Sequence, residues 1–237
     1  MLGSRGLCQD AIASFDDALR ACAEFGKGSI AVQKLSALTL GNKGAALGDL
    51  EQFAAAVECY DGALAIQQPF LQSGQPTVAD YATTLMNKGW ALINLTRGLD
   101  GILCLEEALA MRRQLAADDG AHSLPDLARS LYTLAEGCFK LGQFDRALAA
   151  FDEELVILRQ LIAAGLLKYE EELAYSLAAK ADTLRKLHRF RAAKATSDEA
   201  VPLFLKLARS SDNPKLTSAL ATALRGREMI VRRLQPK

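Results

Sequence analysis

The chain has 237 residues, of which half are hydrophobic and only 6% are aromatic, and its 28 Lys and Arg residues balance 28 Asp and Glu residues. This neutral total gives the whole molecule no electrostatic preference for nucleic acid or for an anionic membrane. Ala and Leu dominate the composition and there are only six prolines, a mixture that favours helices. We therefore expect an all-α protein.

The neutral total hides an uneven distribution of charge. Residues 180–237 carry 14 basic and 5 acidic side chains, which leaves 14 basic and 23 acidic side chains for residues 1–179. The sequence therefore predicts an acidic first part and a basic C-terminal end.

The five cysteines are an odd number and none lies in a CxxC pair, so neither a metal knuckle nor a disulfide framework is indicated. Free thiols in a reducing compartment are the simplest interpretation. The sequence shows no signal peptide and no apolar run of membrane-spanning length, and we expect a cytoplasmic protein with no membrane partner.

A repeat runs along the chain. One small residue recurs at intervals of 45, 45, 46 and 46 residues, at Ala11, Ala56, Gly101, Ala147 and Ala193. A second small residue recurs upstream, at Gly44, Gly89, Ala135 and Ala181. Hydrophobic residues three and four positions away from these sites mark amphipathic helices. Small residues at both positions allow two antiparallel helices to approach closely, so each repeat predicts a helix pair.

In chain order, the sequence predicts a partial repeat at 1–27, full repeats at 28–73, 74–117, 124–166 and 167–210, and a C-terminal capping helix at 213–235. A single helix pair cannot bury its apolar face, so successive pairs are expected to stack. We predict one continuous solenoid over residues 1–237.

Both ends of the chain carry further signals. Aligning Leu2-Gly3 with Leu47-Gly48 places Met1 inside a helix and near its end, so the chain is expected to start in the middle of a repeat. The apolar face around Phe15 and Leu19 would then be uncovered, as binding surfaces often are.

At the other end, Asn213-Pro214 predicts a helix start. The arginines that follow suit the solvated outer face of a capping helix; they are Arg225, Arg227, Arg232 and Arg233.

The order of small residue, corner aromatic, Ala, aromatic and Ala-Leu resembles the tetratricopeptide repeat, in a version longer than its usual length of roughly 34 residues. Long repeats of this kind are similar to those of kinesin light chain and of bacterial signalling proteins, and Pro125–Leu131 is similar to the bacterial type. The resemblance implies a right-handed superhelical solenoid of antiparallel helix pairs. It also implies a protein-binding function, with the first helix of each pair lining a concave groove.

Groups suited to catalysis are few. No HExxH, GxSxG, Walker or GxGxxG pattern is present, and the two histidines, His122 and His188, fall in a linker and at a helix corner. The acidic pairs Asp16-Asp17, Glu106-Glu107 and Glu153-Glu154 are interpreted as solvated helix surface. We expect no enzymatic activity, no cofactor and no metal.

The resemblance maps the groove onto particular residues. The predicted partner-binding residues are Asn42, Asn87, Trp90, Asn94, Arg129, Tyr132, Glu136, Lys140, Arg185 and Lys186. Asn42 and Asn87 share one repeat position, where tetratricopeptide proteins often use Asn to hold a peptide backbone; the alternative is that Asn is merely tolerated there. Trp90, the only tryptophan, is predicted as an interface anchor, with core packing as its alternative.

These residues predict a partner segment with hydrophobic anchors and acidic residues, the latter facing Lys140, Arg185 and Lys186. The main alternative is a self-assembly scaffold, in which the acidic part of one copy meets the basic end of another. RNA binding through the basic cluster that starts at Arg185 is a weaker alternative because the chain is neutral overall. A small signalling ligand is a further possibility.

Overall fold

The computed structural model describes residues 2–26, 29–72, 78–211 and 213–235, and every regular element in these ranges is helical. The all-α expectation is confirmed. The chain forms two compact units, unit 1 (Met1–Asp118) and unit 2 (Asp119–Lys237).

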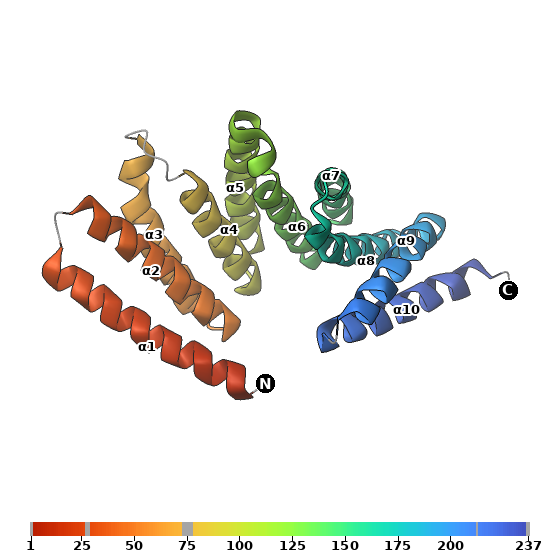
Figure 1. Cartoon of the computed structure of the whole chain (residues 1–237), viewed down its shortest axis with the longest axis horizontal. Coiled ribbons are helices and arrows are strands. Elements are labelled where there is room, and N and C mark those ends of the chain that lie inside the picture. Colours follow the sequence, from red (N-terminus) through yellow and green to blue (C-terminus); the bar gives the residue numbers. More distant parts are fainter. Residues whose placement is uncertain (1, 27–28, 73–77, 212, 236–237) are drawn as a thin grey trace. The chain divides into compact units, whose positions relative to one another are not determined.

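Unit 1 consists of five α-helices that follow one another side by side (Figure 1). They are α1 (Leu2–Phe25), α2 (Ile30–Asp49), α3 (Phe53–Gln72), α4 (Val78–Asn94) and α5 (Gly98–Asp119). Helix α2 packs against both α1 and α3, and α3 also packs against α4.

Unit 2 has the same plan, with two short 3-10 helices between its α-helices. Its elements are η1 (Gly120–His122), α6 (Leu124–Lys140), α7 (Phe144–Ala163), η2 (Leu167–Tyr169), α8 (Glu170–Lys186), α9 (Phe190–Ser210) and α10 (Pro214–Leu234). Each α-helix packs against the next, and α8 also contacts α6 and α10. Helices α6, α8 and α10 therefore form one layer, and α7 and α9 form the other.

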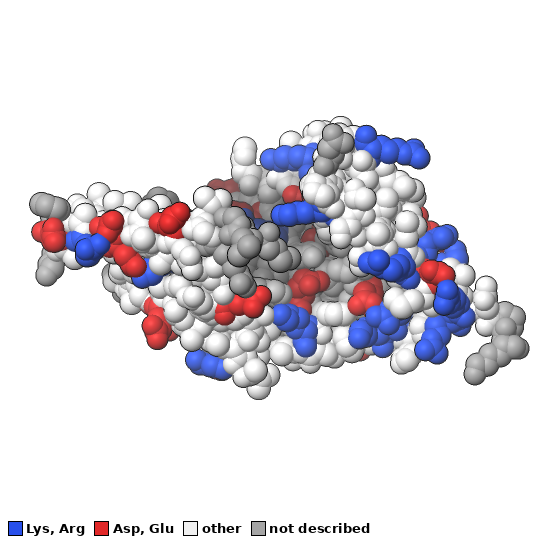
Figure 2. Space-filling view, turned by 90° about the horizontal axis from the view of Figure 1, so that it is seen from below, with Lys and Arg blue, Asp and Glu red and all other residues white. Residues whose placement is uncertain are grey.

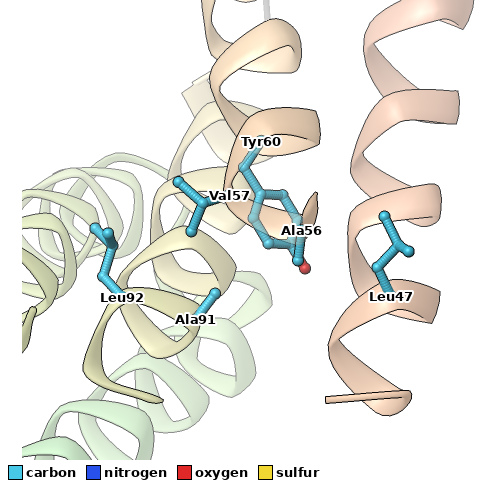
Figure 3. Packing of buried hydrophobic residues seen from close by; sticks show 6 residues of the cluster. All are labelled: Leu47, Ala56, Val57, Tyr60, Ala91 and Leu92. Carbon is cyan, nitrogen blue, oxygen red and sulfur yellow. The ribbon is translucent and has the colours of Figure 1, made fainter. Parts of the chain in front are cut away.

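The small residues of the repeat lie where helices cross. Ala56 is fully buried, and a Cβ atom added to Gly44 would lie 2.6 Å from the Tyr60 ring. A Cβ added to Gly101 would lie 2.6 Å from the Gly89 carbonyl oxygen. Figure 3 shows the resulting cluster of side chains from α2, α3 and α4, which are Leu47, Ala56, Val57, Tyr60, Ala91 and Leu92. The predicted close approach of paired helices is confirmed at these sites.

Four corners between paired helices share one backbone conformation. The residue that reverses the chain has a positive φ at each corner, and the four are Glu51 (61°), Thr96 (64°), Gly142 (73°) and His188 (57°). The amide of the following residue then donates to a carbonyl five residues back, as from Gln52 to Leu47 at 2.9 Å. This closes the helix end in the manner of a Schellman motif.

The helix end that was predicted near the start of the chain is wrong, because helix α1 runs from Leu2 to Phe25 without a break. The position equivalent to the chain-reversing residue Glu51 is Gly6, and Gly6 lies within the helix instead of in a left-handed turn.

The predicted start of the last helix is confirmed. Asn213 caps α10, since its side-chain oxygen accepts a hydrogen bond from the Lys215 amide at 3.0 Å, and Pro214 occupies the first helical position.

An ion pair recurs between consecutive repeats. An aspartate on the second helix of one pair contacts a cation on the following helix, in Asp16–Lys43, Asp61–Lys88, Asp152–Lys180 and Asp198–Arg227. The partners are half-exposed to exposed, so these pairs contribute more to the register of neighbouring helices than to stability.

Candidate functional site

Unit 2 contains two cavities that occupy equivalent places in successive repeats. The α6/α8 cavity, of about 490 Å³, has α6 and α8 as walls and α7 as floor. The α8/α10 cavity, of about 820 Å³, has α8 and α10 as walls and α9 as floor. Glu154 and Leu158 of the first floor lie 46 residues before Ala200 and Phe204 of the second. The two cavities therefore lie at the same position of two successive repeats, and they differ in the side chains that line them.

The α8/α10 cavity is apolar at its base. Phe204 and Ala200 are almost fully buried, and the Tyr175 ring meets the Phe204 ring edge-on with 5.2 Å between centroids. Ala219, Ala223 and the exposed Met229 extend this surface along α10. Together they form an apolar surface that a hydrophobic side chain can cover.

Charges surround this apolar base, and cations outnumber acids among them. The cations are Arg185, Lys215, Arg225 and Arg232, and the acids are Asp182 and Glu228. Asp182 accepts from Arg185 Nε at 2.7 Å, and Glu228 accepts from Arg232 at 2.6 Å. Figure 2 shows Lys and Arg prevailing over Asp and Glu at the C-terminal end of unit 2. The α8/α10 cavity therefore combines an apolar base with a net positive rim.

The α6/α8 cavity has a carboxyl group in its floor. Glu154 is only 2% exposed, and its Oε1 accepts a 2.6 Å hydrogen bond from Ser176 Oγ, whereas Oε2 is buried with no partner. Burial raises the pKa of Glu154 to about 8, helped by the negative charges of Glu136 and Glu172 and opposed by the Ser176 hydrogen bond. This carboxyl group is therefore mostly protonated at neutral pH.

Aromatic rings form much of the wall above Glu154. Tyr132, Tyr169 and Tyr175 line the cavity. The nearest cation by sequence is Lys168, whose Nζ lies 5.1 Å from the centroid of the Tyr169 ring. Arg129, which lines the cavity, is held to Asp126 at 2.6 Å.

The interpretation of Glu153-Glu154 as solvated helix surface is wrong for Glu154. The signal that could have revealed it is in the repeat itself. At the position of Glu154, other repeats have the buried alanines Ala63, Ala108 and Ala200. The packing of the helices at this position therefore requires only a small residue. A second buried charge that sequence reasoning missed is Arg112, which donates to the Ala79 carbonyl at 2.8 Å.

The predicted site residues of unit 2 divide between the cavities and the surface. Arg129 and Tyr132 line the α6/α8 cavity, and Arg185 lines the α8/α10 cavity. Glu136 is half-buried on α6, and burial raises its pKa. Lys140 and Lys186 are exposed at the C-terminal ends of α6 and α8 and are not among the lining residues of either cavity.

The predicted site residues of unit 1 lie on α2 and α4. Asn42 is exposed on α2, and Asn87 and Trp90 are half-buried on α4. The side-chain amide of Asn94 donates a 2.8 Å hydrogen bond to the Trp90 carbonyl oxygen, so part of its hydrogen-bonding capacity is used within its own helix. Partner binding by these residues stays a prediction.

The interpretation of the α10 arginines as solvated is wrong for Arg227, which is half-buried and donates a hydrogen bond to Asp198 of α9. Arg225 and Arg232 are exposed, and they line the α8/α10 cavity. The predicted capping helix is therefore one wall of a cavity.

Two further properties of the described residues bear on function. No helix in the described ranges is long and apolar enough to cross a membrane. Within the same ranges, no three His, Cys, Asp or Glu side chains come together in an arrangement that could hold a metal ion. The five cysteines are free thiols, and Cys138 is buried.

Comparison with known proteins identifies the fold. No protein-family model and no curated protein matches the sequence. A putative kinesin light chain from Podospora anserina with TPR-like repeats is similar at a TM-score of 0.65 and 17% identity, over 86% of this chain and 90% of that one. BtubC from P. vanneervenii is similar at 0.55 and 14%, over 97% and 94%.

The apo form of RapI is similar at a TM-score of 0.64 and 14% identity, over 90% of this chain and 54% of RapI, so the chain spans about half the length of that protein. These similarities establish a tetratricopeptide-like fold, and the predicted resemblance to long kinesin light chain-type and bacterial repeats is confirmed at the level of fold.

Proposed function

We propose that the protein is a non-catalytic interaction module that binds a peptide or helix of a partner protein in its groove, with the α8/α10 cavity as the principal contact. The bound segment carries a hydrophobic anchor and adjacent acidic residues. The observation that carries this proposal is the accessible apolar lining of Tyr175, Ala219, Ala223 and Met229 beneath a rim in which cations outnumber acids.

The two features act differently in binding. Covering Tyr175, Ala219, Ala223 and Met229, which are partly or fully exposed, removes hydrophobic surface from water and provides affinity. The rim favours acidic residues, and it sets the direction of the segment and the rate of its association. Because Lys215 and Arg225 are exposed, their contribution should weaken as salt screens them.

The test is a selection of random peptides from a display library on the immobilised full chain. We expect the enriched sequences to share a large hydrophobic residue next to Asp or Glu. A double variant, Lys215→Glu with Arg225→Glu, should bind these peptides roughly tenfold or more weakly, since two favourable charges become repulsive.

The matched control is Arg233→Glu, which changes the same charge at an exposed position of α10 outside the cavity lining. It should retain nearly full affinity. Enrichment of basic peptides, or equal binding by the double variant, would contradict the proposal.

A second candidate function is self-assembly, which the charge distribution favours because residues 180–237 are basic and the preceding residues are acidic. It predicts sedimentation coefficients that rise with protein concentration at low salt and fall at high salt. A size that does not change with concentration would exclude it.

A further inference from the structure

The α6/α8 cavity has a property that partner binding in the neighbouring cavity does not explain. Its floor holds Glu154 where Ala63, Ala108 and Ala200 serve in the other repeats, so helix packing does not call for a carboxyl group. Buried carboxyl groups normally have a hydrogen bond for each oxygen. Glu154 has one, from Ser176, and its Oε2 is left without a partner.

Among the described residues, no basic side chain is one of the charges that act on this carboxyl group, and the Lys168 ammonium lies over the Tyr169 ring instead. The charges that act on Glu154 are those of Glu136 and Glu172, and both are negative. Arg129 lines the cavity but its guanidinium is held by Asp126 at 2.6 Å, and its side chain is 55% exposed. The cavity therefore has the negative charges of Glu136 and Glu172 nearby and a carboxyl oxygen without a hydrogen-bond partner in its floor.

The walls suit an organic cation with an aliphatic stem. Tyr132, Tyr169 and Tyr175 line the cavity, and aromatic rings attract cations as well as alkyl chains. The volume of about 490 Å³ is far larger than the roughly 30 Å³ that one water molecule occupies. A metal ion would need several oxygen ligands, and no cluster of three suitable side chains occurs in the described part of the chain.

We propose that the α6/α8 cavity binds a primary alkylammonium group, whose N–H donates to Glu154 Oε2 while the tyrosine rings pack along its alkyl chain. Glu172, which also lines the cavity, adds to the attraction. The group can belong to a lysine side chain of a partner peptide or to a free amine. This inference concerns the neighbouring cavity, which shares only Tyr175 with the cavity of the proposed function, and it does not rest on that function.

Binding must be linked to the proton on Glu154. Burial holds the carboxyl group mostly protonated at neutral pH in the free protein, and an ammonium group in contact with it favours the ionised form. Binding at about pH 7 therefore releases a proton, and affinity rises as the pH rises toward about 8. Alkylammonium groups stay charged throughout, since their pKa is about 10.4.

Other charged or titratable groups near Glu154 also affect how binding depends on pH. Those with charge or a titratable hydroxyl that line the cavity or act on Glu154 are Asp126, Arg129, Tyr132 and Glu136 of α6, Tyr169 of η2, and Glu172 and Tyr175 of α8. Burial raises the pKa of Tyr132, Glu136 and Tyr175 as well. Tyr132 and Tyr175 therefore stay neutral over the pH range of the experiment.

The experiment is isothermal titration calorimetry of the full chain with three small probes. Nα-acetyl-lysine methylamide and 1,5-diaminopentane carry the ammonium group, and Nα-acetyl-norleucine methylamide is the neutral counterpart of the first. We expect the lysine derivative or the diamine to bind at least about tenfold more tightly than the norleucine derivative. The tighter of the two cations identifies a peptide or a free amine as the source.

Two variants test the role of Glu154. Glu154→Gln and Glu154→Ala should each weaken cation binding by about tenfold or more and abolish the proton release, which is read from the dependence of the binding enthalpy on the buffer. Glu154→Ala keeps the fold because Ala is the residue of the other repeats. Glu153→Gln, a change on the same helix outside the cavity lining, should bind as the wild type does.

Three results would overturn the inference. They are equal affinity for the lysine and norleucine derivatives, unchanged cation binding in both Glu154 variants, and no binding of either cation at about 1 mM.

Discussion

Ser176 Oγ on α8 donates a 2.6 Å hydrogen bond to Glu154 Oε1 on α7, where the helices of two consecutive repeats pack together. This bond satisfies one half of a carboxyl group whose other oxygen is buried without a partner. A carboxyl group in this environment is tolerated when it is protonated and is costly when it ionises. The contact therefore makes the stability of unit 2 depend on pH.

The first prediction follows from the upward shift of the pKa of Glu154. The pKa of Glu154 is raised in the folded state to about 8 from an ordinary 4.5, so the folded state binds more protons than the unfolded state between these values. The free energy of unfolding should fall by a few kcal/mol as the pH rises from about 5 to about 8. Urea titrations across this range measure it.

The matched variant for this prediction is Glu154→Gln, which keeps the shape and cannot ionise. Most of the decline should disappear in it, with a small remainder from Glu136, whose pKa burial also raises. A stability that rises between about pH 5 and about pH 8 in the wild type, or the same decline in the variant, would contradict this account.

The second prediction concerns the helix corners. Thr96 is β-branched and has a φ of 64°, where an L-residue with a branched side chain is strained. Replacing Thr96 with Gly should raise the free energy of unfolding by roughly 1 kcal/mol.

Gly142 is at the equivalent corner of unit 2, with a φ of 73° and no atom near its absent side chain. Gly142→Thr should therefore lower stability by roughly 1 kcal/mol through backbone strain alone. Thermal unfolding of both variants measures the pair. Opposite signs support the shared corner geometry, and a loss of stability in Thr96→Gly would refute it.

The third prediction concerns the close approach of α4 and α5. A Cβ atom at Gly101 would lie 2.6 Å from the Gly89 carbonyl oxygen and 2.6 Å from a side-chain carbon of Ile93. Because the first of these atoms belongs to the backbone, the helices would have to separate, and Gly101→Ala should cost roughly 1 to 3 kcal/mol.

The control for this third prediction is Gly41→Ala, in the middle of α2, where an added Cβ meets no atom within 4 Å. Here the helix propensity of Ala should stabilise the chain by up to about 1 kcal/mol. Denaturant midpoints of the two variants should therefore move in opposite directions, and a neutral Gly101→Ala would show that the two helices can separate without cost.

Much of the fold could be predicted because the repeat records the packing. The small residues Ala56, Gly44 and Gly101 recur at fixed intervals, and they lie where helices cross. The start of α10 could be predicted because Asn-Pro acts locally, through a cap and a fixed φ.

The conformation of the chain-reversing corners was harder to predict from the sequence. Glu51 and Thr96 have positive φ values but are not residues that favour them, and His188 is of a type only moderately enriched there. Tertiary packing of the flanking helices imposes the conformation, and the residue type does not reveal it. Conversely, Gly6 permits a left-handed turn at the equivalent position and lies within a helix.

The candidate site could be predicted only in part. Helical periodicity put Arg129, Tyr132 and Arg185 on first helices, and these residues line cavities. The floor was missed because it comes from second helices, where Glu154 interrupts a run of alanines and Phe204 appears as ordinary core. Arginines on α10 looked solvated because sequence alone does not show that α8 and α10 meet.

The central claim is that the α8/α10 cavity receives the hydrophobic anchor of a partner segment. Thr222 is an exposed residue of its lining, and its neighbour Ala221 is an exposed residue outside the lining, so tryptophan at each position forms a matched pair. The most direct measurement is the affinity of one selected peptide for Thr222→Trp and for Ala221→Trp. The account predicts a loss of roughly tenfold or more for Thr222→Trp and near wild-type affinity for Ala221→Trp. Equal affinities in the two variants, with both folded as the wild type, would contradict it.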